Sequence, residues 1–142
     1  MDLNKKIEEL NNLESKLLLI IGAPGSGKSK VIREYSQETG IPIIDLDKIF
    51  VNTPSEKIME QMKNFLNTYN QEVLLLDNKK ILYAKNSKID MLAFLKEISK
   101  TIPVIATWNG KIEDRQLFHL RKDAPEDLIY SVNPDEFKYI LC

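Results

Sequence analysis

The sequence is poor in cysteine, which limits the ways in which its fold can be stabilised. Cys142 is the only cysteine among 142 residues, so no disulfide can form within the chain. A chain without disulfides fits a reducing compartment. The longest aliphatic run, residues 17–21, is far too short to cross a bilayer. The segment 1–16 is charged throughout and is not typical of a signal peptide. We therefore expect a cytoplasmic protein that makes no membrane contact.

An excess of charge of one sign is also missing. The formal net charge is −1 at pH 7. This value argues against a strong electrostatic attraction to nucleic acid, although contact between DNA and a local patch remains open. His119 is the single histidine. One histidine cannot form a metal site, so we expect it to be structural. The length suits one domain better than two, and the apolar content of 43% predicts an ordinary packed core.

The apolar pattern predicts an α/β fold. Apolar residues recur at helical spacing or form continuous strand-like runs. Helices are predicted at 2–15 (cap Asp2), 28–39 (ended by Gly40), 53–69 (cap Thr53, with Pro54 at the first position) and 90–100 (cap Asp90). Strands are predicted at 16–21, 41–46, 72–77 and 102–107. Strands alternate with helices four times, so a mainly parallel sheet with right-handed crossovers is expected.

The last part of the chain has a different pattern. Three short strand-like pieces occur at 116–120, 127–132 and 137–141, and they predict a hairpin or edge strands. We therefore expect a single domain over 1–142. It comprises an N-terminal helix (1–15), a core (17–110) and a short β-rich C-terminal segment (111–142).

The most informative motif is "GAPGSGKS" at residues 22–29, which fits G-x-x-x-x-G-K-[ST] without deviation. It follows a predicted strand and opens a predicted helix, which is the context that a P-loop requires. Its glycines let successive backbone N–H groups point at phosphate oxygens, and the helix N-terminus adds partial positive charge. The lysine can reach the β- and γ-phosphates, and the serine can bind Mg²⁺. The residues expected to bind the nucleotide are Gly22, Ala23, Pro24, Gly25, Ser26, Gly27, Lys28, Ser29 and Lys30.

A second motif is the run "LLLDN" at residues 74–78. Asp77 ends an apolar strand about fifty residues after the glycine-rich motif, and this strand is expected to lie beside the first one. Its carboxylate is the predicted Walker B partner of Ser29 in holding Mg²⁺. Many P-loop ATPases have a glutamate at the next position, where it polarises the attacking water, but here the residue is Asn78. An amide cannot act as a general base, although it can hold a water by hydrogen bonds.

The run "PVIATWNG" at residues 103–110 is similar to a segment of AAA-type ATPases, in which the asparagine contacts the γ-phosphate or the attacking water. Asn109 matches that position. The P-loop, "LLLDN" and "ATWNG" together resemble BrxF, the small P-loop protein of type 3 BREX bacteriophage-defence systems. The resemblance covers about residues 17–131. It implies an AAA-like P-loop NTPase with a three-layer core of the ASCE strand order, binding ATP and Mg²⁺. Lys28, Asp77, Asn78 and Asn109 are the implied catalytic residues.

The resemblance also implies partners. BrxF acts beside other, larger BREX proteins, and AAA-type sites often take an arginine from a neighbouring subunit of a homo-oligomer. Arg115 and Arg121 follow Asn109, as such arginine fingers do, although solvated surface arginines would also fit. The C-terminal segment does not predict the helical lid that follows the core in full AAA proteins, so weak hydrolysis by the isolated chain is expected. The lysines at positions 79, 80, 85 and 88 are interpreted as a solvated face, although contact with DNA or a partner would also fit.

Two other functions remain open. "IIDLDK" at residues 43–48 is similar to a segment of small-molecule kinases of the shikimate kinase type, which have an Asp-x-Asp pair after the second strand. Asp45 or Asp47 would then act on the hydroxyl of a substrate. A non-hydrolysing adaptor, whose bound nucleotide controls larger partners, is the third possibility.

Overall fold

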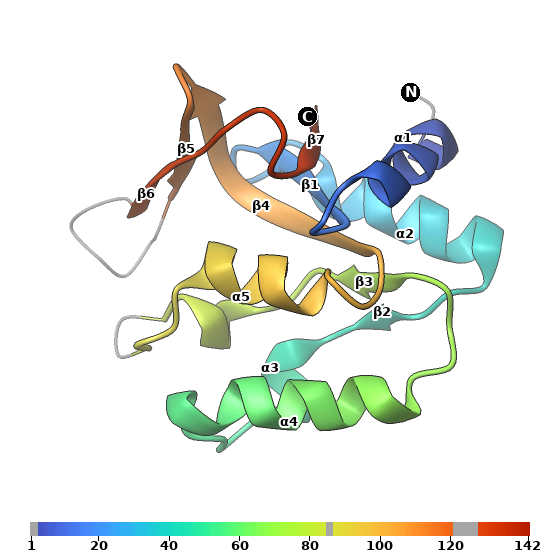
Figure 1. The fold of residues 1–142 in the computed structure, drawn as a ribbon, viewed down its shortest axis with the longest axis vertical. Coiled ribbons are helices and arrows are strands. Elements are labelled where there is room, and N and C mark those ends of the chain that lie inside the picture. Colours follow the sequence, from blue (N-terminus) through green and yellow to red (C-terminus); the bar gives the residue numbers. More distant parts are fainter. Residues whose placement is uncertain (1–2, 85–86, 121–127) are drawn as a thin grey trace.

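The computed structural model describes residues 3–84, 87–120 and 128–142, which form an α/β fold with a mainly parallel central sheet (Figure 1). The helices are α1 (Leu3–Glu9), α2 (Lys28–Thr39), α3 (Leu46–Ile49), α4 (Ser55–Thr68) and α5 (Met91–Ile98), with 3-10 turns η1 (Leu10–Asn12) and η2 (Lys80–Leu82). The strands are β1 (Leu17–Gly22), β2 (Ile43–Ile44), β3 (Leu74–Leu76), β4 (Val104–Glu113), β5 (Gln116–His119), β6 (Leu128–Ser131) and β7 (Lys138–Leu141).

The main sheet has the strand order β2-β3-β4-β1-β7, and all four of its neighbouring pairs are parallel. Strand β4 therefore lies between β1 and β3. The expectation that the strand of Asp77 adjoins the first strand is wrong, because β4 pairs with both of them. The carboxyl ends of β1, β3 and β4 open on the same edge of the sheet, which is where α/β proteins bind ligands.

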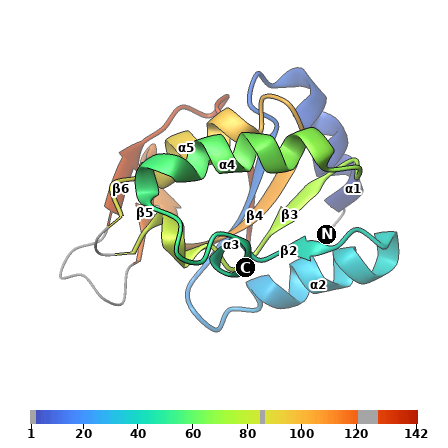
Figure 2. The same ribbon diagram turned by 90° about the horizontal axis from the view of Figure 1, so that it is seen from below.

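The sheet is covered by helices on both faces, which gives three layers (Figures 1 and 2). Every residue of β1 is buried, as its continuous apolar sequence predicts. Its side chains alternate between two cores. Leu17, Leu19 and Ile21 pack with α3, α4 and α5, whereas Leu18 and Ile20 pack with α1 and α2.

Several predicted boundaries shift in the structure. The N-terminal helix is confirmed only over α1 and is followed by η1, and the cap predicted at Asp2 lies outside the described residues. Helix α4 begins at Ser55, so Pro54 is its N-cap residue rather than its first helical residue. Thr53 does not cap the helix. Its N–H donates to the carbonyl of Phe50, which places it in the preceding turn.

The C-terminal segment divides between two sheets. Strand β4 extends beyond the predicted residue 107 to Glu113, because from Gly110 onward it pairs with β5 in an antiparallel hairpin that β6 continues. The two-residue turn, Asp114 and Arg115, has positive φ at both positions (51° and 62°), as a hairpin of this length favours. Strand β7 returns to the main sheet and pairs in parallel with β1. The predicted edge strand is therefore found, and the predicted core boundary at residue 110 falls inside β4.

Gly110 is required where β4 passes from one sheet to the other. A Cβ at this position would collide with the carbonyl oxygen of Phe118 on β5, and it would lie 3.2 Å from Nε1 of Trp108. That indole N–H donates to the same carbonyl over 2.9 Å, and Trp108 is fully buried. Trp108 therefore serves packing, and Gly110 lets β5 approach closely.

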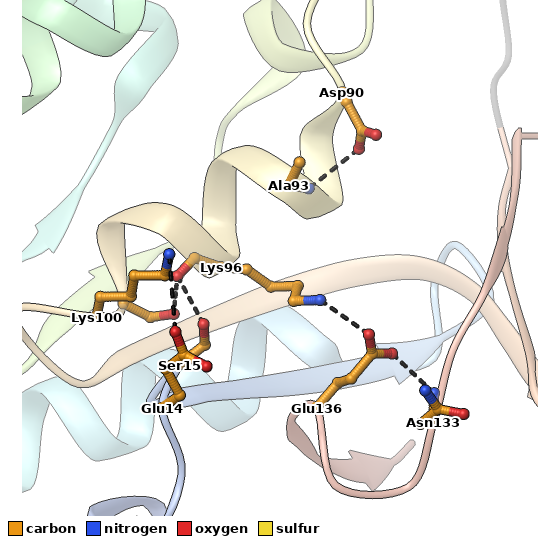
Figure 3. Close-up of polar contacts among 9 residues, drawn as sticks. Glu14, Ser15, Asp90, Ala93, Lys96, Lys100, Asn133 and Glu136 are labelled. Atoms are coloured by element: carbon orange, nitrogen blue, oxygen red, sulfur yellow. Dashed lines mark hydrogen bonds and ion pairs between the residues drawn. The ribbon is translucent and has the colours of Figure 1, made fainter.

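Helix α5 is fixed to its surroundings by polar contacts (Figure 3). Asp90 caps it by accepting a hydrogen bond from the Ala93 N–H, as predicted. Lys96 forms an ion pair with Glu136 over 3.0 Å, and Glu136 also accepts from the Asn133 N–H. Helix and C-terminal segment are thereby joined. Within the described ranges 3–84, 87–120 and 128–142, every helix is too short or too polar to span a bilayer.

Candidate functional site

The glycine-rich loop (residues 22–29) connects β1 to α2 in a conformation that depends on its glycines. Gly25 and Gly27 have φ of 82° and 98°, which side chains rarely tolerate. A Cβ on Gly22 would collide with Oγ of Ser26. Gly27 is the N-cap residue of α2, and no side chain caps the helix. The first N–H groups of a 12-residue helix therefore remain available to an anion.

Lys28 reaches back over the loop. Its Nζ donates to the carbonyl of Ala23 over 2.8 Å and lies 3.5 Å from Oγ of Ser26. The residue is only 6% exposed. This burial lowers the pKa of Lys28, and the negative groups of Cys142 and Asp77 oppose the shift. A bound phosphate would replace these neutral partners with a charged one, which makes a stronger hydrogen bond.

Asp77 lies at the end of β3 and joins the loop to the neighbouring strand. Its Oδ1 accepts a hydrogen bond from Thr107 of β4 over 2.8 Å and another from Ser29 over 3.3 Å. The structure therefore brings together Ser29 and Asp77, which the sequence predicts as the metal pair. Among the described residues, no group donates to Oδ2 of Asp77, so this oxygen can bind a cation.

Magnesium suits this donor set. Mg²⁺ prefers oxygen ligands, and in phosphate sites it uses one or two carboxylates, substrate phosphates and several waters. Ser29 and Asp77 supply a hydroxyl and a carboxylate side by side. Clusters of three or more His, Cys, Asp or Glu side chains that could hold a metal are absent from the described part of the chain. A metal here would thus depend on oxygens from a ligand and from water.

Asn78 follows Asp77 and is fixed by the loop after β2. Its side-chain Nδ2 donates to Oδ2 of Asp45 over 3.1 Å, and its backbone carbonyl accepts from the Leu46 N–H. Asp45 also caps α3 by accepting from the Lys48 N–H. The amide of Asn78 therefore has a defined direction although the residue is exposed.

Asp47, the second carboxylate of the predicted Asp-x-Asp pair, organises the segment after β3. Its two oxygens accept from the backbone N–H groups of Lys80 (3.0 Å) and Ile81 (2.7 Å), at the start of η2. Both aspartates thus already accept hydrogen bonds from protein groups. Neither is held free for an incoming hydroxyl.

Lys79 is buried, and its interpretation as part of a solvated face is wrong. The residue is 5% exposed, and its Nζ donates to Oγ1 of Thr107 and to the carbonyl of Asp77, each over 3.2 Å. Burial lowers the pKa of Lys79 to about 8, and nearby Lys28 lowers it further, whereas Asp77 and Asp47 oppose the shift. Lys79 therefore remains mostly protonated at neutral pH. The neighbouring Lys80 and Lys88 are exposed as predicted, and Lys85 lies outside the described residues.

A cavity of about 610 Å³ connects these groups, a volume typical of small-molecule sites. Asn109 lies on its wall, because Asn109 is the partner of Gly22 in the register of β4 and β1. The lining residues are Pro24, Gly25, Gly27, Lys28, Ser29, Lys30, Arg33, Asp47, Asp77, Asn78, Lys79, Lys80, Tyr83, Thr107, Asn109 and His119.

Of the two predicted arginine fingers, Arg115 does not line this cavity. Arg115 is exposed in the turn between β4 and β5, and it lines separate hollows beside Asn133. Arg121 lies outside the described residues. Arg115 therefore does not contact the cavity of its own chain in this structure.

Sequence reasoning missed several residues of the cavity wall, among them Thr107, Lys79 and His119. Thr107 had a usable signal, because it lies two residues before Asn109 and so faces the same side of β4. Lys79 had none, since a lysine in a polar run normally indicates solvent exposure. His119 is buried, as its structural role predicts, but its ring lies 4.4 Å from that of Tyr83 and lines the cavity.

Comparison with known proteins adds no family to this description. A scan against protein-family models and a search of curated proteins both find no match. The function must therefore be argued from the geometry of the site.

Proposed function

We propose that this protein binds Mg-ATP and hydrolyses it as an AAA-like P-loop NTPase. The contact between Ser29 and Asp77 carries the proposal. It joins a hydroxyl at the start of α2 to a carboxylate at the end of β3, beside a loop whose backbone and lysine suit phosphate. The strand order, with β4 between β1 and β3, also supports this class, since it agrees with the expected ASCE order.

The proposed reaction is hydrolysis of the γ-phosphoryl group. A water oxygen bonds to the γ-phosphorus while the bond from that phosphorus to the bridging oxygen breaks. ADP leaves with the bonding electrons, and the proton of the water passes to the released phosphate or to solvent. The roles of the chain are to position the phosphates, orient the water through Asn78 and Asn109, and neutralise charge. When bound, Mg²⁺ would supply further neutralisation of phosphate charge.

The isolated chain is proposed to hydrolyse ATP weakly. Among the described residues that line the cavity, the carboxylates are Asp47 and Asp77, and no glutamate is present. Asp77 is assigned to the metal, and Asp47 accepts two backbone N–H groups. The site thus contains no evident general base. A partner could complete it, and the sequence resemblance to BrxF favours partners among larger proteins of BREX phage defence in the bacterial cytoplasm.

The kinase alternative is less favoured by the geometry. Asp45 caps α3 and accepts from Asn78, and Asp47 fixes η2. A catalytic base needs a carboxylate directed at the substrate hydroxyl. The adaptor alternative differs from the proposed ATPase only in that bound ATP is not hydrolysed. A measurement of ATP turnover therefore distinguishes the two.

The test is titration of the purified protein with ATP in the presence and absence of Mg²⁺, using Lys28→Ala and the control Lys57→Ala. Lys57 is exposed on α4, away from the cavity. Lys28→Ala is expected to weaken binding by about 2–3 kcal/mol, the scale of a lost charge-assisted hydrogen bond. Equal ATP affinity in all three proteins would refute the proposal. Binding without turnover, with or without candidate partners, would favour the adaptor.

A further inference from the structure

Lys79 has an unusual position for a lysine that follows a strand end. Its ammonium group lies inside the cavity wall, between the end of β3 and the middle of β4. Its partners are a carbonyl of Asp77 and the hydroxyl of Thr107, both uncharged groups. An ammonium has three N–H donors, and the described residues accept only two of them. The third donor remains available on the wall of the cavity.

A purely structural role explains this arrangement poorly. Lys79 does join the ends of two strands. However, burying a charge is unfavourable, and apolar side chains of similar size often replace buried charges without loss of stability. The carboxylates of Asp77 and Asp47 offset part of this cost, whereas a second lysine, Lys28, lies close enough to disfavour the charge of Lys79 further. Two positive groups in one wall are unfavourable in the empty site and become favourable when an anion binds.

We propose that Lys79 is a catalytic cation supplied from within the chain, whose third N–H contacts an anionic oxygen of the transferring γ-phosphoryl group. This inference rests on the proposed function and names the residue that neutralises charge in that same site. In many P-loop enzymes this task belongs to an arginine from the same chain or a partner. Here the cation is itself buried, and fixed charges shielded from water act most strongly on a developing charge.

The exposed cations at the rim of the cavity are less suited to this role. Lys30, Arg33 and Lys80 also line the cavity, but all three are exposed. Exposed charges are screened by water and salt. Lys79 is instead held by two hydrogen bonds, so its position is set before the substrate arrives.

The experiment compares wild type with Lys79→Met, which keeps most of the length of the side chain and removes its charge. Single-turnover ATP hydrolysis, the affinity for Mg-ADP, and the affinity for Mg-ADP with aluminium fluoride would be measured. Aluminium fluoride is an anion that imitates the transferring phosphoryl group. We expect the rate to fall about 100-fold, the scale for one lost donor at a developing charge. The affinity for Mg-ADP with aluminium fluoride should fall by a similar factor. The affinity for Mg-ADP alone should stay within about 2-fold of the wild-type value.

A second variant separates direct contact from positioning. Thr107→Val removes the hydroxyl that links Lys79 to Asp77 but keeps the ammonium group. If Lys79 acts only by orienting Asp77, Thr107→Val will reproduce the entire loss, and both variants will need more Mg²⁺ to bind nucleotide. That result would overturn the proposal. A smaller loss in Thr107→Val, together with unchanged Mg²⁺ dependence in Lys79→Met, would support it.

Protein stability provides the remaining controls. Lys57→Met replaces an exposed lysine and should change neither rate nor unfolding temperature. Lys79→Met is expected to unfold at the same temperature as wild type or higher. A lower unfolding temperature of Lys79→Met, together with a loss of Mg-ADP affinity, would show that Lys79 has a structural role and would overturn the inference.

Equal rates of ATP hydrolysis in wild type and Lys79→Met would refute this inference alone. Failure of wild type to bind Mg-ATP would refute the proposed function as well.

Discussion

Ser29 and Asp77 are 48 positions apart in the chain, and their side-chain oxygens lie 3.3 Å from each other. Ser29 lies in the first turn of α2 and Asp77 follows β3, although β3 does not pair with β1. Thr107 of β4, the strand between them, donates to the same carboxylate oxygen of Asp77. The pair is thus positioned through the intervening strand, and the neighbouring groups of the cavity are arranged around it.

The first prediction concerns magnesium. Asp77→Asn keeps the size of the side chain but removes the charge that attracts a divalent cation. We expect nucleotide binding by this variant to depend much less on Mg²⁺, with a loss of at least 10-fold in apparent Mg²⁺ affinity, since carboxylates are the principal protein ligands of this ion. The measurement is an Mg²⁺ titration at fixed nucleotide. Asp135→Asn, at an exposed position, is the control. Superimposable titrations of wild type and Asp77→Asn would contradict the assignment.

The second prediction concerns the missing base. Asn78→Glu would supply a carboxylate, but it would also remove the donor to Asp45 and place two carboxylates together. We expect little gain from Asn78→Glu alone. In combination with Asp45→Asn, the new amide at position 45 can donate to the new carboxylate at position 78, which reverses the direction of the original hydrogen bond. Asparagine also remains a suitable N-cap residue for α3. The double variant should raise the steady-state ATPase rate about 100-fold, the lower range for a positioned base.

The control for this prediction is Asp45→Asn alone, which should leave the rate close to that of wild type. No gain in the double variant would mean that the site lacks more than a base. A group from another chain would then be the next explanation.

The third prediction concerns Arg115. Both Arg115 and Asp114 have positive φ, which strains residues other than glycine. Arg115→Gly should therefore stabilise the fold by up to about 1 kcal/mol, measured by urea unfolding, whereas Asp114→Gly should change stability little, because aspartate tolerates this conformation. If Arg115 completes the site of a neighbouring chain, only Arg115→Gly will lose the part of the ATPase rate that rises with protein concentration or partner. Equal rates in both variants across a concentration series would exclude Arg115 as an arginine finger.

The fourth prediction concerns the link between α5 and the C-terminal segment. The N–H of Asn133 and then the ammonium of Lys96 lower the pKa of Glu136, against the opposing effect of burial. The folded state thus favours the charged carboxylate. Its stabilising contribution is complete above the ordinary glutamate pKa of about 4.5 and is lost as the pH falls through the lower pKa of the folded state.

Glu136→Gln should accordingly reduce the free energy of unfolding by about 1 kcal/mol at pH 7, and this difference should shrink as the pH falls below 4.5. Glu113→Gln is the matched control, because Glu113 pairs with Lys111 at an exposed position and should change stability little. A difference for Glu136→Gln that stays constant between pH 7 and pH 3 would contradict the linkage.

The sequence by itself determined most of the elements and the conformation of the glycine-rich loop. Continuous apolar runs predicted β1, β3 and the start of β4, because strands buried on both faces need no alternation. The positions of Gly25, Gly27 and Lys28 predicted the loop, since only certain residues suit its backbone and charge. Helix caps at Gly40 and Asp90 were also local, and they were predicted correctly. These features depend on interactions between near neighbours in the chain.

Only the tertiary structure decided which strand lies between β1 and β3, that β7 joins the main sheet, and that Lys79 is buried rather than solvated. Each of these depends on contacts between distant segments. The sequence pattern of a lysine run is the same on a surface and on a cavity wall. Its burial follows from the approach of β4, which brings the hydroxyl of Thr107 to 3.2 Å from Nζ of Lys79. Local propensity carries no information about that approach, because strand order is set by packing of the whole sheet.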